Sequence, residues 1–391
     1  MTFPTGDSEE KVPLWRDQRF WRIALQVLAL VLVALLAWTL LGNLMANWAR
    51  RGTQFTYRFL TQAASFNIGE TLIPYTTNDS YLKALFVGLL NTLRVVLLGF
   101  VLTTLVGTLA GIASFSQNWL LRQLSRVYVE IVRNIPLLLQ LIFWYFIVFL
   151  SLPKPDEQIS LLNAFYLSKA GIYMPWPRNS PMLWLSLLAL VMGAIAAVLL
   201  WNWRTKRMVE RGASGRPQML ALIGIGIVSL IILIFGLGWE IPQSTQPGQV
   251  TGGARFSSEL GGLLFGLVFY TGAFIAEIVR GGIQSVSKGQ WEAARSLGLH
   301  SGLVMQLVVL PQALRVILPS LNSQYMNLAK NSSLALAVGY PDVFSVAATS
   351  LNQTGRSVEL VIIIAATYLI LNLVISLVMN QINRLVQFKE R

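Results

Sequence analysis

The chain has 391 residues, of which 54% are hydrophobic and only 12% are charged, and its mean hydropathy is +0.60. Globular proteins carry about a quarter charged residues, so this composition excludes a soluble globular protein and indicates a polytopic membrane protein. The net charge of +13 does not indicate nucleic-acid binding, because the basic residues lie mostly at the ends of apolar runs, where they set membrane topology.

Eight apolar stretches approach the length of about 20 residues that a helix needs to cross the hydrocarbon core. They lie at residues 23–47, 84–113, 132–152, 183–203, 219–238, 260–280, 314–338 and 358–380. The first is too long for the hydrophobic region of a cleaved signal, about 7–15 residues, so we expect a retained span. Pro136 and Pro319 lie near the starts of the third and seventh stretches, where a proline costs little.

The distribution of lysine and arginine predicts the orientation. The N-terminal segment and every second segment after it hold 19 of these residues, whereas the intervening segments hold nine. Because positive residues accumulate on the cytoplasmic side, both termini are expected in the cytoplasm. The densest basic block, at residues 204–216, independently predicts a cytoplasmic loop between the fourth and fifth stretches.

Three charged residues lie inside or near the ends of these stretches, where charge is costly and usually functional. A guanidinium matches a carboxylate with two hydrogen bonds, so Arg94 in the second stretch could bind a substrate carboxylate. A structural ion pair or snorkelling is the alternative. Lys330 in the seventh stretch either lines a pathway or pairs with Glu277, and Glu277 could instead pair with Arg280 at i,i+3.

The most distinctive pattern is KGQWEAARSLG at residues 288–298, followed by VVLP at 308–311, between the sixth and seventh stretches. A short helix beginning at Ser287 or Gly289 would place Glu292 in its first turn, where negative charge complements the helix dipole. Gly298 suits the position after a helix where positive φ is required. The pattern therefore predicts a short docking helix on the cytoplasmic side, with an ordinary interfacial helix as the alternative.

This loop resembles the EAA loop of ABC importer permeases, in which a cytoplasmic loop docks a separate ATPase. Ala293 and Ala294 would keep one face thin for the partner. The resemblance assigns to the docking loop residues Gln290, Trp291, Glu292, Ala293, Ala294, Arg295, Gly298 and Pro311. The chain has no phosphate-binding GxxxxGK[ST] loop, so no cofactor is expected on it, and ATP with Mg²⁺ is expected on the partner ATPase.

Four further segments resemble permeases for polar amino acids. They are GLLNTL at 88–93, YVEIVRNIPLLLQ at 128–140, YTGAFIAEIVRGG at 270–282 and KNSSL at 330–334. The last is a variant of the family's Lys-Asp-Thr-Ser-Leu, and its departures at Asn331 and Ser332 remove a carboxylate. The resemblance covers about residues 80–150 and 258–391. It implies an all-α fold with a five-helix permease core within about eight transmembrane helices.

The expected organisation has two parts. Residues 1–80 form an N-terminal cytoplasmic segment, an extra first span and a periplasmic loop, and residues 81–391 form the permease domain. An insertion at about 152–258 holds the fourth and fifth spans, and this long form resembles permeases of general L-amino acid importers. The inserted pair is expected to face lipid or to pack against a sister subunit.

The resemblance implies a permease subunit, not an enzyme, in a bacterial inner membrane, importing polar or general L-amino acids. Its expected partners are a sister permease in a heterodimer, two ATPase subunits and a periplasmic binding protein, with no nucleic acid. No catalytic or metal site is expected. The candidate substrate pathway comprises Asn91, Arg94, Glu277, Lys330, Asn331 and Ser332.

Other classes of membrane protein fit these patterns less well. An ion-coupled secondary amino-acid transporter would need a coupling-ion site near the midplane, commonly between inverted repeats. The sequence shows no convincing inverted repeat and few acidic residues at that depth. A channel or a membrane-embedded enzyme would leave the docking loop unexplained.

Overall fold

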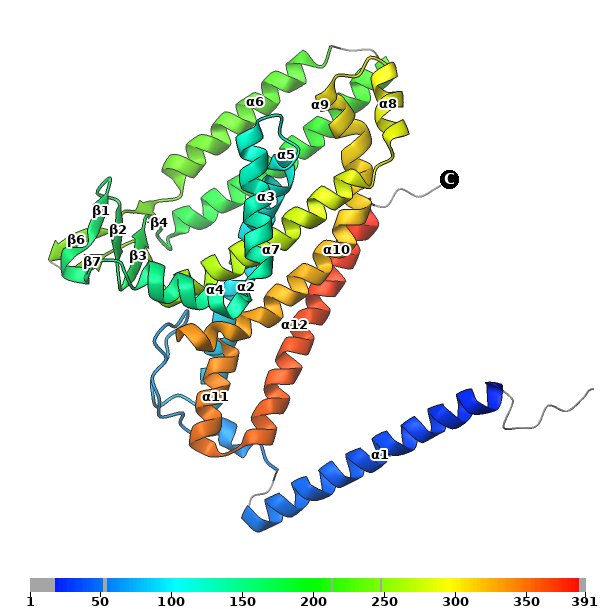
Figure 1. Ribbon diagram of the computed structural model, residues 1–391. Helices are drawn as coiled ribbons and strands as arrows, with labels where there is room; N and C mark the ends of the chain where they lie inside the picture. Colours follow the sequence, from blue (N-terminus) through cyan, green and yellow to red (C-terminus); the bar gives the residue numbers. More distant parts are fainter. Residues whose placement is uncertain (1–17, 52–54, 212–213, 247, 387–391) are drawn as a thin grey trace, which may run out of the picture. The chain divides into compact units, whose positions relative to one another are not determined.

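The computed structural model describes residues 18–51, 55–211, 214–246 and 248–386 (Figure 1). The chain divides into two compact units, Met1–Phe59 and Leu60–Arg391. The first contains α1 (Gln18–Arg51), which includes the predicted first span and has no buried residue in its most apolar window. Residues 60–80 belong with the second unit.

Among the described residues, seven helices are long and apolar enough to cross a membrane. Besides α1, they are α2 (Tyr81–Ala113), α5 (Pro181–Arg211), α6 (Arg216–Ile231) with its extension η5 (Ile232–Gly236), α7 (Ser258–Gln284), α10 (Leu310–Asn331) with flanking turns, and α12 (Ser357–Val386). The mainly helical fold and seven of the eight predicted spans are therefore confirmed.

The third predicted span, at 132–152, is not one straight helix. Helix α3 (Trp119–Asn134) and helix α4 (Leu137–Ile142), which continues as the π-helix η3 (Phe143–Phe149), meet at a bend of 109°. Ile135 between them is extended, with φ −103° and ψ 129°. A proline disfavours helical backbone in the residue before it, so Pro136 ends α3 and becomes the N-cap of α4.

The expected position of Pro319 is also corrected. A short helix α9 (Ser301–Val304) and a π-helix η6 (Met305–Val309) lead directly into α10. Because α10 already begins at Leu310, Pro311 takes the first-turn position and Pro319 lies inside the helix. The helix then tightens into the 3₁₀ segment η7 (Ser332–Val338).

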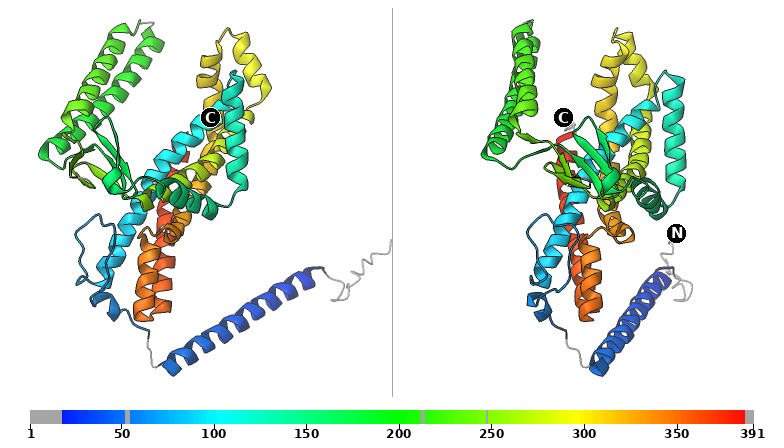
Figure 2. Two further views of the ribbon diagram at one scale, coloured as in Figure 1. Left: turned by 60° about the vertical axis from the view of Figure 1, so that its left-hand side comes forward. Right: turned by 90° about the vertical axis from the view of Figure 1, so that its left-hand side faces the viewer.

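The centre of the second unit is a close packing of α2 against α7. An added Cβ at Gly107 would lie 2.5 Å from the Cβ of Ile275, and one at Gly111 would lie 2.8 Å from the Cβ of Val279. Only glycine allows this approach of the two backbones. Helices α3, α4 and α10 pack on α7, and α12 packs on α10 (Figure 2).

The inserted segment contains β-structure that the sequence analysis did not foresee. A four-stranded antiparallel sheet has the order β1 (Ile159–Leu161), β2 (Phe165–Ser168), β3 (Gly171–Met174) and β8 (Ala254–Phe256). It pairs Ile159 with Leu167 and Ile172 with Phe256. Two small pairs accompany it, β4 (Trp176–Pro177) with β5 (Trp239–Glu240) and β6 (Gln243–Gln246) with β7 (Gln249–Thr251). The two ends of the insertion are thus joined in one sheet.

Between these strands the chain makes the hairpin of α5 and α6, which extends away from the core helices (Figure 2). The two helices pack on each other, and only 6% and 0% of their most apolar windows are buried within the chain. The sheet connects the hairpin to the core. Lys169 lies in the turn between β2 and β3, and its carbonyl accepts a hydrogen bond at 2.8 Å from Ser258 Oγ at the start of α7.

Candidate functional site

The docking loop forms the helix α8 (Lys288–Ser296), as predicted. Ser287 is extended and serves as the N-cap, and Gln290 N donates to Ser287 O at 3.0 Å. The helix therefore begins early enough that Glu292 is its fifth residue, and the expectation that Glu292 lies in the first turn is wrong. Gly298 has φ +76°, the positive value predicted for the residue that ends the helix.

The two faces of α8 have different neighbours. Trp291 is half-buried and Ala294 is buried, and both pack on a hydrophobic cluster formed mainly by α7 and α10, which we call the α7–α10 cluster. Its members include Val279, Ile283, Val309, Ala313 and Ile317. Ala294 therefore faces its own chain rather than a partner, which corrects the expectation for this residue.

The opposite face of α8 is open. Glu292, Ala293 and Arg295 are exposed, and Leu297 just after the helix is 81% exposed. Gln312 Nε2 of α10 lies 3.4 Å from Gln290 Oε1, which links the start of the helix to the next span. The loop thus presents a short surface that includes an exposed leucine and is held from behind by two long helices.

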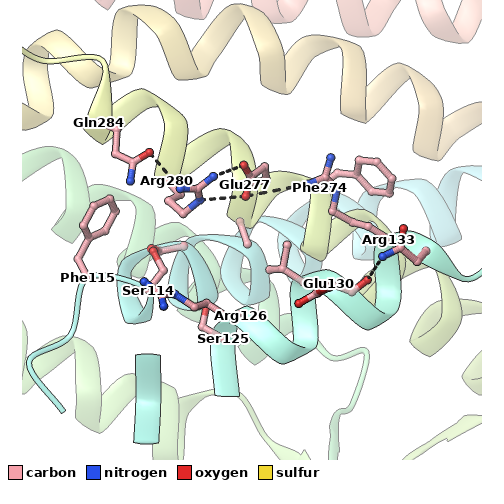
Figure 3. A pocket seen from close by; sticks show the side chains of 14 residues that line it. Ser114, Phe115, Ser125, Arg126, Glu130, Arg133, Phe274, Glu277, Arg280 and Gln284 are labelled. Carbon is pink, nitrogen blue, oxygen red and sulfur yellow. Dashed lines mark hydrogen bonds and ion pairs between the residues drawn. The ribbon is translucent and has the colours of Figure 1, made fainter. Parts of the chain in front are cut away.

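A cavity of about 680 Å³ lies between α2, α3 and α7 (Figure 3). Its charged lining comprises three arginines and two glutamates, Arg126, Glu130, Arg133, Glu277 and Arg280. Ser114, Ser125, Asn134 and Gln284 add polar groups. A cavity with both charge signs and a surplus of guanidinium groups is suited to a small zwitterion or anion.

Glu277 is the central carboxylate of this cavity. It pairs with Arg280, whose Nε lies 3.0 Å from Oε2, and Arg133 Nη1 lies 4.0 Å from the same oxygen. Arg133 also lies over the ring of Phe274 at 5.2 Å. The alternative in which Glu277 pairs with Arg280 is confirmed. The pairing with Lys330 is wrong, because in the described chain Glu277 pairs with Arg280 and Arg133, and Lys330 lies in the last turn of α10, whereas α10 meets this part of α7 near Ile317.

Arg94 lies in a different cluster, in the N-terminal half of α2 and beside the start of α7, away from the docking loop. It pairs with Glu70, and its guanidinium lies 5.3 Å from the ring of Phe256. The second carboxylate oxygen of Glu70 accepts a hydrogen bond from Ser257 Oγ at 2.6 Å. Glu70 therefore bridges α2 to the N-cap of α7. Glu70 precedes α2 in a loop without a recognisable pattern and was not predicted as a site residue.

Residues 88–92 of α2 contact the segment at residues 341–343, which leads into the helix after η7. Asn91 is fully buried and donates to Glu70 O at 2.8 Å and Pro341 O at 2.9 Å. Thr92 Oγ1 accepts from Val343 N at 3.0 Å, and the backbone approaches Gly88 so closely that a Cβ would lie 2.9 Å from Val343 Cα. In the structure Asn91 and Thr92 thus hydrogen-bond backbone groups of their own chain and hold two segments together.

Lys330, Asn331 and Ser332 lie where α10 gives way to η7. Lys330 is exposed, whereas Ser332 is buried and donates to Ala329 O at 2.8 Å. The six residues of the candidate pathway thus fall at three places. Asn91 and Arg94 lie beside Glu70, Glu277 lies in the charged cavity, and the remaining three lie at the end of α10.

Comparison with known proteins places this architecture in a family. Residues 103–388 match the family described as "Binding-protein-dependent transport system inner membrane component". The chain is 40% identical over 381 residues to the general L-amino acid transport system permease protein AapQ of Rhizobium johnstonii, covering 96% of this chain and 94% of that one. It is 39% identical to the glutamate/glutamine/aspartate/asparagine transport system permease protein BztB of Rhodobacter capsulatus, covering 96% of each chain.

A crystal structure of an amino acid ABC transporter with histidines is similar, with a TM-score of 0.47 and 22% identity over 78% of this chain and 94% of that one. The relatives are permeases, which are transport components rather than enzymes, and they favour the permease interpretation over the ion-coupled one. The chain belongs to the binding-protein-dependent transport system inner membrane component family and is a permease subunit of an ABC transporter.

Proposed function

We propose that this chain is the permease subunit of an ATP-driven importer for polar or general L-amino acids. The observation that carries the proposal is the exposed face of α8, which is braced by α7, the same helix that supplies Glu277 and Arg280 to the charged cavity. The names of the relatives support amino acids as substrates, with acidic amino acids and their amides among them.

The proposed importer needs partner chains, because this chain has no phosphate-binding loop of its own. Two separate ATPase subunits bind ATP and Mg²⁺, and one of them docks on α8 of this chain. A sister permease completes the membrane unit and binds the other, and a periplasmic binding protein delivers the substrate. The excess of lysine and arginine supports a bacterial inner-membrane orientation with both termini in the cytoplasm. The exposed Lys330 then lies against the sister subunit or the pathway, because a lysine facing lipid at that depth is costly.

The cavity of Figure 3 is the inner part of the substrate pathway in this proposal. Arginine side chains there receive the substrate carboxylate, and the two glutamates receive its ammonium group. A shift of α7 relative to α3 would change the separation of Glu277 from Arg133 and release the substrate. This is rigid-body coupling, and the chemistry of ATP hydrolysis belongs to the partner.

The docking surface is tested by Leu297→Asp, which places a charge on the exposed side of the loop. The variant should fold normally and no longer co-purify with the ATPase. Gln117→Asp is the matched control, because it adds the same charge to the exposed turn between α2 and α3. Retention of the ATPase by Leu297→Asp would contradict the proposed docking surface.

Transport is tested with the assembled complex in proteoliposomes, using labelled glutamate and unlabelled competitors. Uptake should require ATP and should be reduced by glutamine, aspartate and asparagine. Glu277→Gln preserves the side-chain volume, and loss of a charged hydrogen-bond partner worth about 1.5 kcal/mol should lower uptake about tenfold. ATPase binding should be unchanged. Uptake driven by an ion gradient without the ATPase would refute the proposal.

A further inference from the structure

The turn between α5 and α6 carries a basic cluster that neither the docking loop nor the cavity uses. Residues 204–216 contain five lysines and arginines and a single acid, Glu210. Among the described side chains of this turn, the ion pair is that of Lys206 with Glu210, at 3.9 Å and largely exposed. Arg204, Arg207 and Arg216 thus keep a local surplus of positive charge. We call these three residues, with Trp201 and Trp203, the basic turn.

The depth of the basic turn is set by the lengths of its two helices. The stretch from Pro181 to Trp203 contains 23 residues without charge, which at 1.5 Å per residue span about 34 Å. Residues 217–236 of α6 and its extension contain 20 uncharged residues, spanning about 30 Å. The hydrocarbon core is about 30 Å thick. Arg204 and Arg216 therefore reach the same headgroup layer.

The arginines are held in defined positions. The guanidinium of Arg204 lies 5.3 Å from the Trp201 ring, and its Nε donates to Gly215 O at 3.1 Å. The guanidinium of Arg207 lies 4.5 Å from the Trp203 ring. Arg204 and Arg207 are three residues apart and share one side of α5. Contact with a tryptophan face positions each guanidinium group and leaves its terminal N–H groups able to donate.

The start of α6 adds uncapped backbone donors beside these arginines. Its N-cap is Gly215, with φ +61°, and no side chain caps the helix. A Cβ at this position would lie 2.7 Å from Met208 Sδ, so the turn brings α5 and α6 close together. The first N–H groups of a helix have no internal partner and favour anions, and here Arg216 and Gln218 supply them, because Pro217 between them has no N–H. Three features converge here, namely the surplus charge, the oriented guanidinium groups and the free amides.

We propose that the basic turn binds the phosphate of an anionic phospholipid headgroup. The occupant follows from the surroundings, since the hairpin is almost unburied within the chain and its turn lies at headgroup depth. Interfacial tryptophans at 201 and 203 suit the same layer. The bound lipid fixes the inserted pair of spans at the membrane surface, independently of substrate transport.

The test uses native mass spectrometry of the full-length chain, titrated with phosphatidylglycerol or phosphatidylcholine of identical acyl chains. The wild type should bind phosphatidylglycerol more tightly. Arg204→Gln with Arg207→Gln should weaken this binding about 25-fold, from about 5-fold per arginine near an anionic surface. Arg204→Lys with Arg207→Lys preserves charge and topology but removes the planar guanidinium groups, and should weaken binding by less than the glutamine pair does.

The matched control is Lys154→Gln with Lys169→Gln, which removes two exposed charges from the opposite end of the hairpin and should leave the affinity unchanged. Equal binding of both lipids, or an equal loss in the control, would overturn the proposal. Complete displacement of phosphatidylglycerol by excess inorganic phosphate would also overturn it, because the site would then bind free phosphate. If the double glutamine variant fails to fold, the double lysine variant still tests the proposal, because it keeps the charges that set the topology.

Discussion

The pair of Arg94 and Glu70 allows the structural and substrate-binding interpretations of Arg94 to be separated. Both side chains are 18% exposed, and the carboxylate also accepts from Ser257. Breaking a buried pair by removing one partner costs about 3–5 kcal/mol, and partial solvent screening reduces this to about 2 kcal/mol here. Arg94→Gln and Glu70→Gln should each lower the free energy of unfolding by about that amount.

The double variant should cost about 2 kcal/mol rather than 4, because neither charge is then left unpaired, giving a coupling energy of about 2 kcal/mol. Equilibrium unfolding in detergent measures this cycle, with uptake measured in parallel. Lys83→Gln removes a more exposed pair, between Lys83 in the first turn of α2 and Asp79 just before the helix, and should change stability little. If Arg94→Gln unfolds like the wild type yet loses uptake, Arg94 binds substrate and the structural interpretation fails.

Three further predictions concern single residues. Thr92→Val should lower the free energy of unfolding by about 1–3 kcal/mol, because it leaves the N–H of Val343 without its acceptor; unchanged detergent unfolding would contradict this. Gly298→Ala should strain the positive φ by about 1 kcal/mol and weaken ATPase co-purification, whereas the control Gly289→Ala has open space and should not. Burial raises the pKa of Asp342 to about 6. Ionisation of this carboxyl therefore lowers the stability of the fold as the pH rises from about 4 to 6. Asp342→Asn should flatten that part of the stability–pH profile, which thermal unfolding measures.

The sequence predicted those features that depend on local rules. Span lengths follow from hydropathy, and the positive φ of Gly298 follows from its place after a short helix. The bend before α4 was missed although Pro136 was noted, because a proline near a span start is compatible with either a straight helix or a break. The strands were missed because they are short, and β6, with Gln243-Ser-Thr-Gln246, shows no apolar alternation.

Partners of charged residues were harder to predict than their positions. Hydropathy identified Arg94 as a charge at depth, but Glu70 lies 24 residues earlier in an irregular loop and meets it only through tertiary folding. For Glu277, by contrast, the partner Arg280 is set by helical spacing and was foreseen. Ala293 and Ala294 are adjacent in sequence, yet only Ala294 turns toward the core. Helical spacing alone does not predict which face of a short helix is buried, because that depends on the helices that pack against it.

The docking helix and the cavity are connected by packed side chains rather than by a flexible loop. Trp291 and Ala294 pack on the α7–α10 cluster, to which α7 contributes Val279 and Ile283. These residues lie within two turns of Glu277 on the same helix, so we expect a displacement of α8 to move the part of α7 that carries the central carboxylate. Arg280 moves with Glu277, whereas Arg133 belongs to α3 and does not have to follow. We therefore expect the 4.0 Å separation of Arg133 from Glu277 to change when the docking helix moves, which distance measurements between labels on α3 and α7 would test.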